Sequence, residues 1–457
     1  MLSHHAKLVV FFTLLLLGQM AFAVPFGSYD TRSMAMGGVG VALGEADAAP
    51  LYNPALLSVA KDDAHFSLTL PSISVRLSDP DKLLDSIDKF QSGNYVNNLQ
   101  TSVNNLNTSI STVNTTPTPA NFADVGVKAG TVTTDLNSLN TQLATLSNKP
   151  LTAEAGSATV LAIPSKKTGF AFYANANATV GGLFQYKDAA LITGLATQSQ
   201  CLATAAAMPV STPAEIAAAN AAVQACGTPN FSSNSMQSGI NFRGVALGEI
   251  GISLSHEFYF RNRSIAFGIT PKIVKAQLYD APVNVNSSVQ PSGVTGADYR
   301  ADYTFVNFDV GIAKYLRQGW RTGLVIKNVI PHFLDFKNAP TPGATPVANG
   351  NTLNLRPQVR AGVSRSNDWS TLALDVDLTR NDPAGLESAS QYIALGGELN
   401  AWNWAQLRGG YRVDVVNSAR NVASLGLGFS PFGVHADLAV AGNATELGAS
   451  LQIGFRY

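Results

Sequence analysis

The chain carries little charge. Lysine, arginine, aspartate and glutamate make up 13% of its 457 residues, about half the share that is usual for soluble domains. The 30 basic and 30 acidic residues cancel, so the formal net charge at pH 7 is zero. A nucleic-acid partner is therefore not indicated, because proteins that bind nucleic acids present a basic surface.

Cysteine is nearly absent. The only two are Cys201 and Cys226, and no Cys-x-x-Cys occurs, which excludes thioredoxin-type redox chemistry. In an oxidising compartment the pair can close one loop, worth roughly 3–4 kcal/mol on the chain-entropy model. A metal site is the weaker alternative, because histidine partners are lacking nearby. We predict a disulfide between Cys201 and Cys226.

Long apolar runs are also lacking. Past residue 23 no segment is apolar for the 18 or so residues that a transmembrane helix needs. Residues 1–23 have a weakly basic opening up to Lys7, an apolar core at 8–17 and a small-x-small site at 21–23. These are the marks of a secretory signal peptide, and we predict cleavage before Val24. An exported soluble protein and an outer-membrane barrel both fit these observations.

The last eleven or so residues, 447–457, alternate with a period of two. One face carries only apolar side chains and the other mostly glycine and polar ones: Leu447, Ala449, Leu451, Ile453, Phe455 and Tyr457 against Gly448, Ser450, Gln452, Gly454 and Arg456. A strand of this length, tilted by about 45°, crosses a bilayer. Because lipid offers no partner for backbone polar groups, such a strand implies a closed barrel. The alternative is the edge strand of a soluble sandwich.

Further strand patterns fill the chain. The candidates are 65–77, 157–163, 168–182, 241–260, 263–279, 299–316, 319–331, 353–365, 369–380, 388–402, 404–415, 420–429, 433–442 and 446–457. Many alternate as the last one does. The predicted fold class is all-β, a single 14-stranded antiparallel transmembrane β-barrel.

The connections between the candidate strands alternate in length. Tight turns follow every second strand, whereas the other connections are mostly longer. This is the pattern of outer-membrane barrels, whose short turns lie on the periplasmic side. All four tryptophans lie at the short turns, where an interfacial aromatic girdle belongs: Trp320, Trp369, Trp402 and Trp404.

Two insertions interrupt the barrel pattern, at 83–150 and 183–240. The first has two heptad seams separated by a proline-containing break, which predicts an antiparallel helical hairpin over 83–146. A disordered polar loop is the alternative, since its Asn, Thr and Ser residues are poor helix formers. The second is rich in alanine and carries both cysteines, so we predict a helical loop closed by the disulfide.

Residues 33–58 are rich in glycine, but their spacing fits neither a dinucleotide-binding fingerprint nor a P-loop. The stretch MAMGGVGVAL followed by DAAPLYNPALLS resembles the N-terminal segment of FadL-type outer-membrane proteins, and most closely the TraF-like family labelled for conjugal transfer. The resemblance is carried by Gly37, Gly38, Asn53 and Pro54. It implies that residues 24–64 form a hatch inside the barrel of residues 65–457.

Several charged residues are expected to point into the lumen. The carboxylates of Asp375 and Asp377 suggest either acid–base chemistry or ion pairing, and an arginine-bearing strand lies opposite. The short turn that follows residue 365 sets a register that pairs Arg360 with Asp375. The sequence shows no catalytic set, no metal-ligand spacing and no cofactor motif, so we predict no enzyme, no metal and no cofactor.

Two functions are compatible with this pattern. The first is an envelope component associated with conjugal transfer or surface interaction, which meets a protein partner through residues 83–146. The alternative is a passive transporter of hydrophobic small molecules. Both place the protein among the lipids of the outer membrane of a Gram-negative bacterium. Fold analogy alone does not choose between them.

Overall fold

The computed structural model describes residues 22–23, 30–43, 45–59, 66–165, 167–260, 263–284, 299–337, 352–401 and 404–457. Its main body is a closed antiparallel barrel of fourteen strands. The strands are β2 (Ser67–Ser78), β3 (Pro150–Ile163), β4 (Thr168–Gln185), β5 (Gly239–Phe260), β6 (Arg263–Asn284), β7 (Arg300–Tyr315), β8 (Trp320–Lys327), β11 (Gln358–Ser366), β12 (Ser370–Asp377), β14 (Tyr392–Ala401), β15 (Ala405–Asp414), β16 (Val422–Phe429), β17 (Val434–Gly442) and β18 (Glu446–Arg456). The predicted fold class is confirmed.

The barrel closes where β18 pairs with β2. Their pairing runs from Glu446 opposite Ser78 to Arg456 opposite Ser67, with one irregularity between Leu451 and Gly454. Beyond β18 the pairing continues, since Phe66 and Tyr457 exchange two backbone hydrogen bonds of 3.0 and 2.9 Å. Closure matters in lipid, because an open edge would leave a row of backbone groups without partners.

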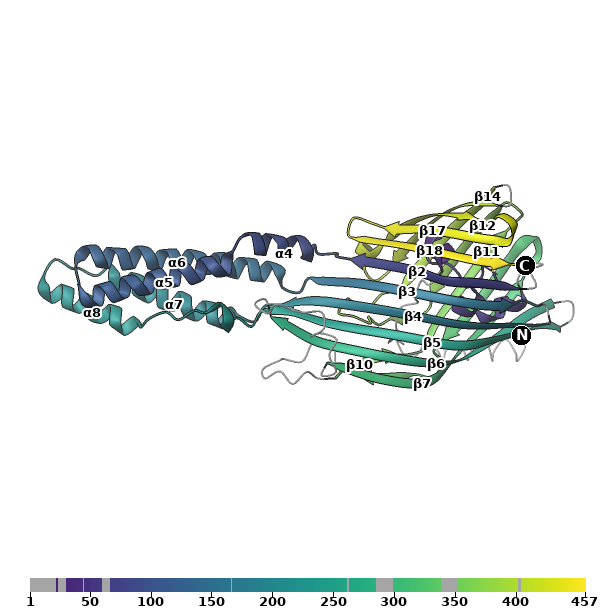
Figure 1. The fold of residues 1–457 in the computed structure, drawn as a ribbon, viewed down its shortest axis with the longest axis horizontal. Coiled ribbons are helices and arrows are strands. Elements are labelled where there is room, and N and C mark those ends of the chain that lie inside the picture. Colours follow the sequence, from purple (N-terminus) through teal and green to yellow (C-terminus); the bar gives the residue numbers. More distant parts are fainter. Residues whose placement is uncertain are drawn as a thin grey trace, which may run out of the picture.

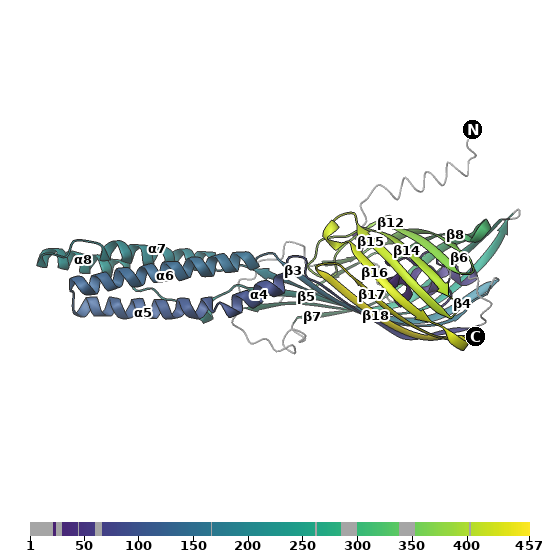
Figure 2. The same cartoon turned by 90° about the horizontal axis from the view of Figure 1, so that it is seen from above.

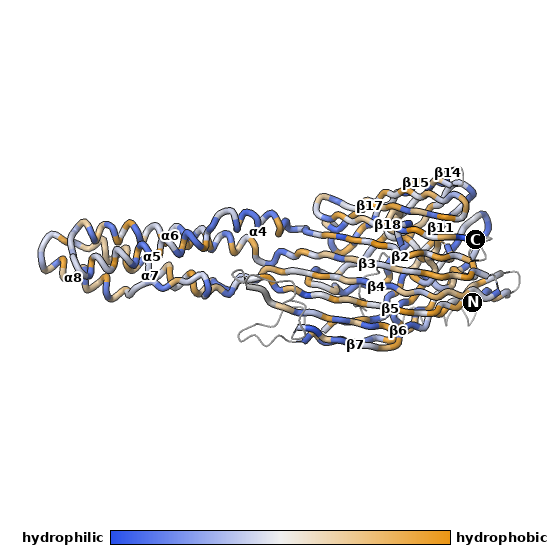
Figure 3. The backbone as a smooth tube through the Cα atoms, viewed as in Figure 1, coloured by the Kyte–Doolittle hydropathy of each residue, from blue (hydrophilic) through white to orange (hydrophobic). Residues whose placement is uncertain are grey.

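The outer surface of the barrel is apolar. Along β18 the side chains of Leu447, Leu451, Ile453 and Phe455 are exposed, whereas the intervening residues point into the lumen and are buried. Figure 3 shows the same alternation of apolar and polar residues along the other strands. The exposed face therefore matches hydrocarbon and the inner face matches a polar, packed interior.

The two rims of the barrel differ. One rim carries the short connections 164–167, 316–319, 367–369 and 430–433 together with the C-terminus, and we call it the short-turn rim. Trp320, Trp369 and Trp404 are exposed there, as an aromatic girdle requires. The fourth tryptophan, Trp402, lies outside the described residues, as does most of the expected signal peptide.

The opposite rim, the long-loop rim, is uneven in height. β5 and β6 have 22 residues each, whereas β8 and β12 have 8 each. About 9–11 tilted residues suffice to cross a bilayer, so one side of the wall extends well beyond it. The outward residues of β6 change accordingly, from exposed Ile269 and Ile273 to Lys275 and Gln277.

One candidate strand is divided in the structure. The prediction of a single strand over 353–365 was wrong: β10 (Thr352–Leu355) pairs with β9 (His332–Asp335) in a separate two-stranded sheet, and the wall strand begins only at Gln358. Pro357 explains the break, because it lacks the N–H that a wall strand needs. The β9–β10 hairpin packs its Leu334 and Leu353 onto β5 and β6 inside the long-loop rim.

The helices form one elongated body that projects from the long-loop rim, on the side away from the C-terminus (Figures 1 and 2). They are α4 (Leu83–Ser92), α5 (Tyr95–Thr115), α6 (Pro119–Leu146), α7 (Ala189–Ala206) and α8 (Pro213–Cys226). We call them the helical spike. No helix among the described residues is long and apolar enough to span a membrane.

The two insertions share one hydrophobic core. Leu136 and Leu139 of α6 are buried together with Ile192 and Leu202 of α7 and Val223 of α8. The helices of the predicted hairpin at 83–146 therefore pack against the second insertion as well as against each other. The α7–α8 pair covers apolar surface of α6, and the disulfide between Cys201 and Cys226 joins α7 to α8.

The segment 30–59 lies inside the barrel, and we call it the hatch. It contains α2 (Thr31–Ala35), α3 (Ala49–Tyr52) and the 3-10 turn η1 (Pro54–Ser58), with almost every described residue buried. On the side of the long loops, the short strand β13 (Arg380–Asn381) begins a segment that turns inward, with Ala384 and Leu386 buried.

Candidate functional site

Local sequence signals determine the path of the hatch. The Asp30 side chain caps α2 by accepting a hydrogen bond from Ser33 N, and Asn53 caps η1 by accepting from Ala55 N. Between the helices the chain reverses at Gly37 and Gly38, whose φ values of 76° and 96° favour glycine. Pro54 follows the Asn53 cap at the first position of η1.

Asn53 also connects the hatch to itself and to the wall. Its amide nitrogen donates to Val41 O at 3.1 Å and to Ile312 O of β7 at 3.2 Å. Gly37 N donates to Ser424 Oγ of β16 at 2.9 Å. The four residues that suggested a hatch therefore lie where the segment turns or contacts the barrel.

Glycines on eight wall strands face the hatch at close range. A side chain at any of them would collide with hatch atoms: Gly169 with Leu57, Gly268 with Pro54 and Ala55, Gly311 with Asn53, Gly323 and Gly362 with Val41, Gly396 and Gly410 with Met36, and Gly426 with Ala35. Glycine permits this approach of backbone to backbone. The wall is thus shaped to hold this segment in one position.

Filling one of these positions should loosen the hatch. In Gly268→Val, the new Cβ meets the backbone of Pro54 and Ala55, and overpacking of this kind costs about 1–3 kcal/mol. We expect a lower urea midpoint in detergent and faster proteolysis within residues 30–59. Gly248→Val on β5 is the control, because no atom lies nearer than 4.0 Å to a Cβ there. Equal midpoints for the two variants would contradict the fit described.

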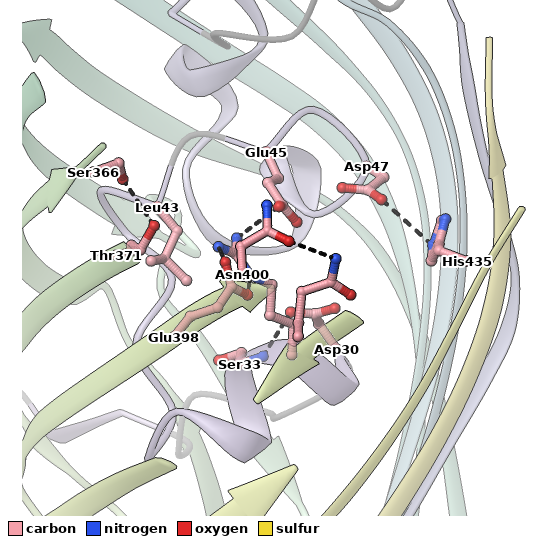
Figure 4. Close-up of polar contacts among 12 residues, drawn as sticks. Asp30, Ser33, Leu43, Glu45, Asp47, Ser366, Thr371, Glu398, Asn400 and His435 are labelled. Carbon is pink, nitrogen blue, oxygen red and sulfur yellow. Dashed lines mark hydrogen bonds and ion pairs between the residues drawn. The ribbon is translucent and has the colours of Figure 1, made fainter. Parts of the chain in front are cut away.

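A chain of ion pairs connects the hatch to the wall at the short-turn rim. Figure 4 shows four of its members, Glu45, Asp47, Glu398 and His435. Arg32 of α2 bridges Glu45, at 2.9 Å, and Glu398 of β14, at 2.7 Å. Arg408 of β15 continues from Glu398 to Asp437, and Arg456 joins Glu45 to Asp47 at 3.0 and 2.8 Å. His435 Nε2 lies 3.7 Å from Asp47. The chain surrounds a polar cavity of about 230 Å³.

The pKa values of two carboxyl groups in the hatch are shifted in opposite directions. Burial, with the nearby Asp47 charge, raises the pKa of Asp30 to about 7, although the Ser33 N–H opposes the shift. Burial would also raise the pKa of Asp47, but the charges of Arg456 and His435 outweigh it and the pKa is lowered. Asp30 is therefore the hatch carboxyl that titrates near neutral pH.

The raised pKa predicts a pH-dependent hatch. The folded state holds the Asp30 proton more tightly than the unfolded chain does, so stability falls as pH rises from about 4 towards 7. Asp30→Asn keeps a capping oxygen and removes the buried charge. We expect the variant to raise the urea midpoint clearly at pH 8 and by a smaller amount at pH 5, where only part of the proton-linked loss of stability has occurred. Asp81→Asn, at an exposed position, is the control. An increase in the urea midpoint by Asp30→Asn that is equal at both pH values would contradict this explanation.

The predicted ion pair between Arg360 and Asp375 is not formed. Arg360 lies opposite Asp377 and bonds to it at 2.5 Å. The register differs from the expected one because the turn lies one residue later along the chain, so that Ser366 faces Thr371 where Arg365 was expected to face Ser370. In this turn Asn367 N donates to Ser370 O, and Asn367 Oδ1 accepts from Ser370 N. Both side chains still face the lumen.

Asp375 has another partner. Its Oδ2 accepts hydrogen bonds from Gly40 N at 2.7 Å and Val41 N at 3.0 Å, so this carboxylate holds the hatch backbone against β12. The two carboxylates of β12 thus have different partners. Asp377 pairs with the wall residue Arg360, whereas Asp375 binds the hatch backbone. These contacts account for both carboxylates as structural groups.

A second charged cluster lies above the hatch, that is, on its long-loop side. Arg76 of β2 pairs with Glu154 of β3 and, at 3.1 Å, with Glu446 of β18. Glu446 also accepts from Arg412 of β15 at 3.1 Å, and the Arg412 guanidinium stacks 4.5 Å from the Tyr392 ring. The cluster borders a cavity of about 80 Å³, whose floor includes hatch residues 34, 37 and 38.

The chain matches, over residues 50–377, the family described as "F plasmid transfer operon, TraF, protein". It belongs to this TraF family. The family predicted from residues 33–58 is thereby confirmed. A search among curated proteins finds no match for this TraF-family chain.

Solved structures similar to the TraF-family barrel include hydrocarbon channels. They include the "TodX deltaS2S3 mutant monoaromatic hydrocarbon channel", 10% identical over 94% of this chain and 99% of that one, with a TM-score of 0.47. The Ralstonia pickettii toluene transporter TbuX is 12% identical over 94% and 98%, with a TM-score of 0.47. The P. putida toluene transporter TodX is 11% identical over 95% and 99%, with a TM-score of 0.42.

Sequence reasoning missed most of the ionic chain in this TraF-family protein. The alternation of the wall strands does place the wall members of the chain on the lumen face: Glu398, Arg408, His435, Asp437 and Arg456. Their partners Arg32, Glu45 and Asp47 lie in a segment without regular periodicity. The available signal was four charged residues, Asp30 included, inside a stretch that is otherwise apolar or small.

Proposed function

We propose that the barrel is an outer-membrane anchor that presents the helical spike at the cell surface, as an envelope component of conjugal transfer. Short turns of outer-membrane barrels face the periplasm, so the long-loop rim and the spike face outward. Residues 1–23 serve as the export signal and residues 24–64 as the hatch in this proposal. The main support for this proposal is the spike, which projects from the long-loop rim.

The spike is built as a stiff surface for contact. Its two insertions share one core, a disulfide ties α7 to α8, and the long strands β4, β5 and β6 support its base. Helices α5 to α8 contain only four charged residues: Asp124, Lys128, Asp135 and Glu215. Their exposed side chains are mostly Asn, Ser, Thr, Gln and Ala. A partner would therefore be held by short-range hydrogen bonds and packing rather than drawn by charge.

The interior of the barrel supports an anchoring role. The hatch fills the lumen near the short-turn rim, and the segment after β13 together with the β9–β10 hairpin packs inside the other rim. A barrel so filled is not a wide aqueous pore. The protein's most extended accessible feature is then the spike.

The test is removal of the spike. Residues 81–148 and 187–237 would each be replaced by a short glycine–serine linker, which removes no wall strand. We expect a barrel that still migrates as a heat-modifiable band, while conjugal transfer from cells carrying it falls to the level of cells without the protein. The control is a chain with a tag inserted into the 430–433 turn, which keeps the spike. Undiminished transfer by spikeless cells would refute the proposal.

A second candidate function is passage of small molecules through the barrel wall. The cavity above the hatch and an outer groove of about 490 Å³ lie on the two faces of the same strands, and Ser74, Ala155, Gly156 and Asn177 line both. No large side chain separates the two spaces at these four positions. Hydrophobic small molecules would move from the cavity to the outer face of the wall here, where the apolar band of β6 ends at Lys275.

Passage can be measured separately from surface contact. Ala155→Trp points its ring into the outer groove, since Ala155 faces outward. We expect this variant to slow uptake of a small apolar solute into vesicles that contain the barrel. Leu447→Trp, on the outer face of β18 away from the groove, is the control. Uptake that is equal in empty vesicles and in vesicles with the protein would exclude this function.

A further inference from the structure

The outer face of the wall is hollowed across β3, β4 and β5. The groove of about 490 Å³ lies there, and the residues that face it from these three strands are all small: Ala155, Ser157, Ala176, Ala178, Ala246 and Gly248. Large, exposed apolar side chains surround them: Ile73, Val180, Ile250 and Ile273. The groove is therefore a gap in the layer of large side chains that covers the outside of the barrel.

The two ends of the groove differ in polarity. One row of paired residues crosses it, from Ile73 on β2 through Ser157, Ala176 and Gly248 to Lys275 on β6. On β2 the outward side chains stay apolar beyond this row, at Val75 and Leu77, whereas on β6 they become polar at Lys275 itself. Because the strands of a barrel are tilted, such a row climbs through the membrane. Its β2 end therefore lies in hydrocarbon and its β6 end at the level of the lipid headgroups.

The polar end of the groove carries a positive charge. Lys275 is exposed, and its ammonium group forms no hydrogen bond or ion pair with the residues that the structure describes. One row further along, the carboxylate of Asp302 is held by Arg300 and Gln277 at 2.9 Å each. The two cations and one carboxylate leave an excess of one positive charge on this outward surface. A phosphate group is its complement.

We propose that the groove binds an acyl chain of a phosphorylated lipid of the outer leaflet, whose phosphate group lies at Lys275. The small residues make room for a chain that large side chains exclude elsewhere on the wall. Since the surrounding lipid is as apolar as the wall, close packing and the ion pair retain this molecule, not the hydrophobic effect. The site depends on the outward orientation of the long-loop rim, as the proposed anchor does, but not on conjugal transfer.

A phosphorylated lipid matches both ends of the groove. Val75, which pairs with Ala155 of the groove, is exposed beside Leu447 and Leu77, so the groove continues into the surface that faces hydrocarbon. None of the described residues that line the groove is acidic, so no carboxylate there repels a phosphate. A soluble anion would leave the apolar floor uncovered, and a neutral apolar molecule would leave Lys275 without a partner.

The test compares dioleoyl phosphatidic acid with dioleoylglycerol, which has the same acyl chains and no phosphate group. Each lipid would be added to the full chain in detergent micelles, and bound lipid would be counted by native mass spectrometry. We expect one phosphatidic acid per barrel and about two- to fivefold weaker retention of dioleoylglycerol, the range of an exposed ion pair. An excess of inorganic phosphate should not displace the lipid, because the acyl chain also binds. Equal retention of the two lipids, or displacement by phosphate, would overturn the proposal.

Filling the groove should remove the site. Ala176→Trp places an indole ring between Ser157 and Gly248, the small neighbours of Ala176 on β3 and β5. We expect retention of phosphatidic acid to fall at least tenfold. Leu425→Trp, at an exposed position on β16 outside the groove, is the control and should retain the lipid as the unchanged chain does. Equal retention by Ala176→Trp and Leu425→Trp would place the lipid elsewhere and refute the site.

Removing the charge should remove the preference for phosphate. Lys275→Gln should bind phosphatidic acid and dioleoylglycerol equally, since only the ion pair distinguishes them. Lys314→Gln, which changes an outward lysine near the short-turn end of β7, should keep the preference. An unchanged preference in Lys275→Gln would contradict the proposed position of the phosphate, and this result stands even if Ala176→Trp fails to assemble.

The lipid site and the passage of small molecules can fail separately, although they share the groove. A preference for phosphatidic acid without protein-dependent uptake of an apolar solute into vesicles would support the lipid site and reject passage. Equal retention of both lipids together with protein-dependent uptake would support passage and reject the lipid site.

Discussion

Removal of residues 455–457 is expected to abolish assembly of the barrel. Phe455 pairs with Val434 on one side and Leu68 on the other, and the backbone of Tyr457 exchanges two hydrogen bonds with Phe66. The deletion opens the seam between β18 and β2 and exposes backbone groups that lipid cannot satisfy. It also removes Arg456, which pairs with Glu45 and Asp47 of the hatch. We expect no heat-modifiable band in membranes from cells that make this variant.

The matched control keeps the backbone and changes only the last side chain. Tyr457→Phe retains the closing hydrogen bonds and an aromatic ring at the interface, so it should assemble as the full chain does. Wild-type amounts of folded barrel from the deletion variant would show that the seam closes without its last residues. That outcome would contradict the pairing at the end of β18.

Replacing Arg32 with methionine is expected to destabilise the hatch strongly. The substitution leaves the partly buried Glu45 and Glu398 with only one arginine partner each, Arg456 and Arg408. Removing one member of a buried ion pair costs roughly 3–5 kcal/mol, because an uncompensated charge remains. The urea midpoint of the protein in detergent should fall, and the hatch should become accessible to protease before the barrel unfolds.

The control for this variant is Arg317→Met. Arg317 is exposed at the short turn between β7 and β8, so its loss should change the midpoint little. A double change, Arg32→Met with Glu398→Met, should recover part of the lost stability, since it also removes one of the two carboxylates that lose Arg32 as a partner. Equal midpoints for Arg32→Met and Arg317→Met would show that the ionic chain does not hold the hatch.

The barrel could be predicted from sequence because its strands are constrained on both faces. Lipid demands apolar residues outside and the packed lumen demands small or polar ones inside, so β12 and β18 alternate cleanly. Short turns and tryptophans then fix which ends belong to one rim. These are local signals, and the family resemblance of residues 33–58 added the hatch.

What could not be predicted depends on contacts between distant segments. The pairing of β11 with β12 differs from the expected register because the turn that Asn367 organises lies one residue later along the chain. The shared core of the spike forms only when α7 packs against α6, although β3 and β4 lie between these helices in the sequence. The ion pair between Arg412 and Glu446 forms only when β15 and β18 curve around the same lumen.

The central claim is that an outer-membrane barrel presents the spike outside the cell. The direct test is antibody binding to intact cells that carry a peptide tag in the α7–α8 turn, after exposed Pro209, or in the 430–433 turn, after exposed Phe432. We predict binding to the first tag on intact cells and to the second only after the outer membrane is permeabilised. The reverse pattern, or a soluble periplasmic protein, would contradict the account.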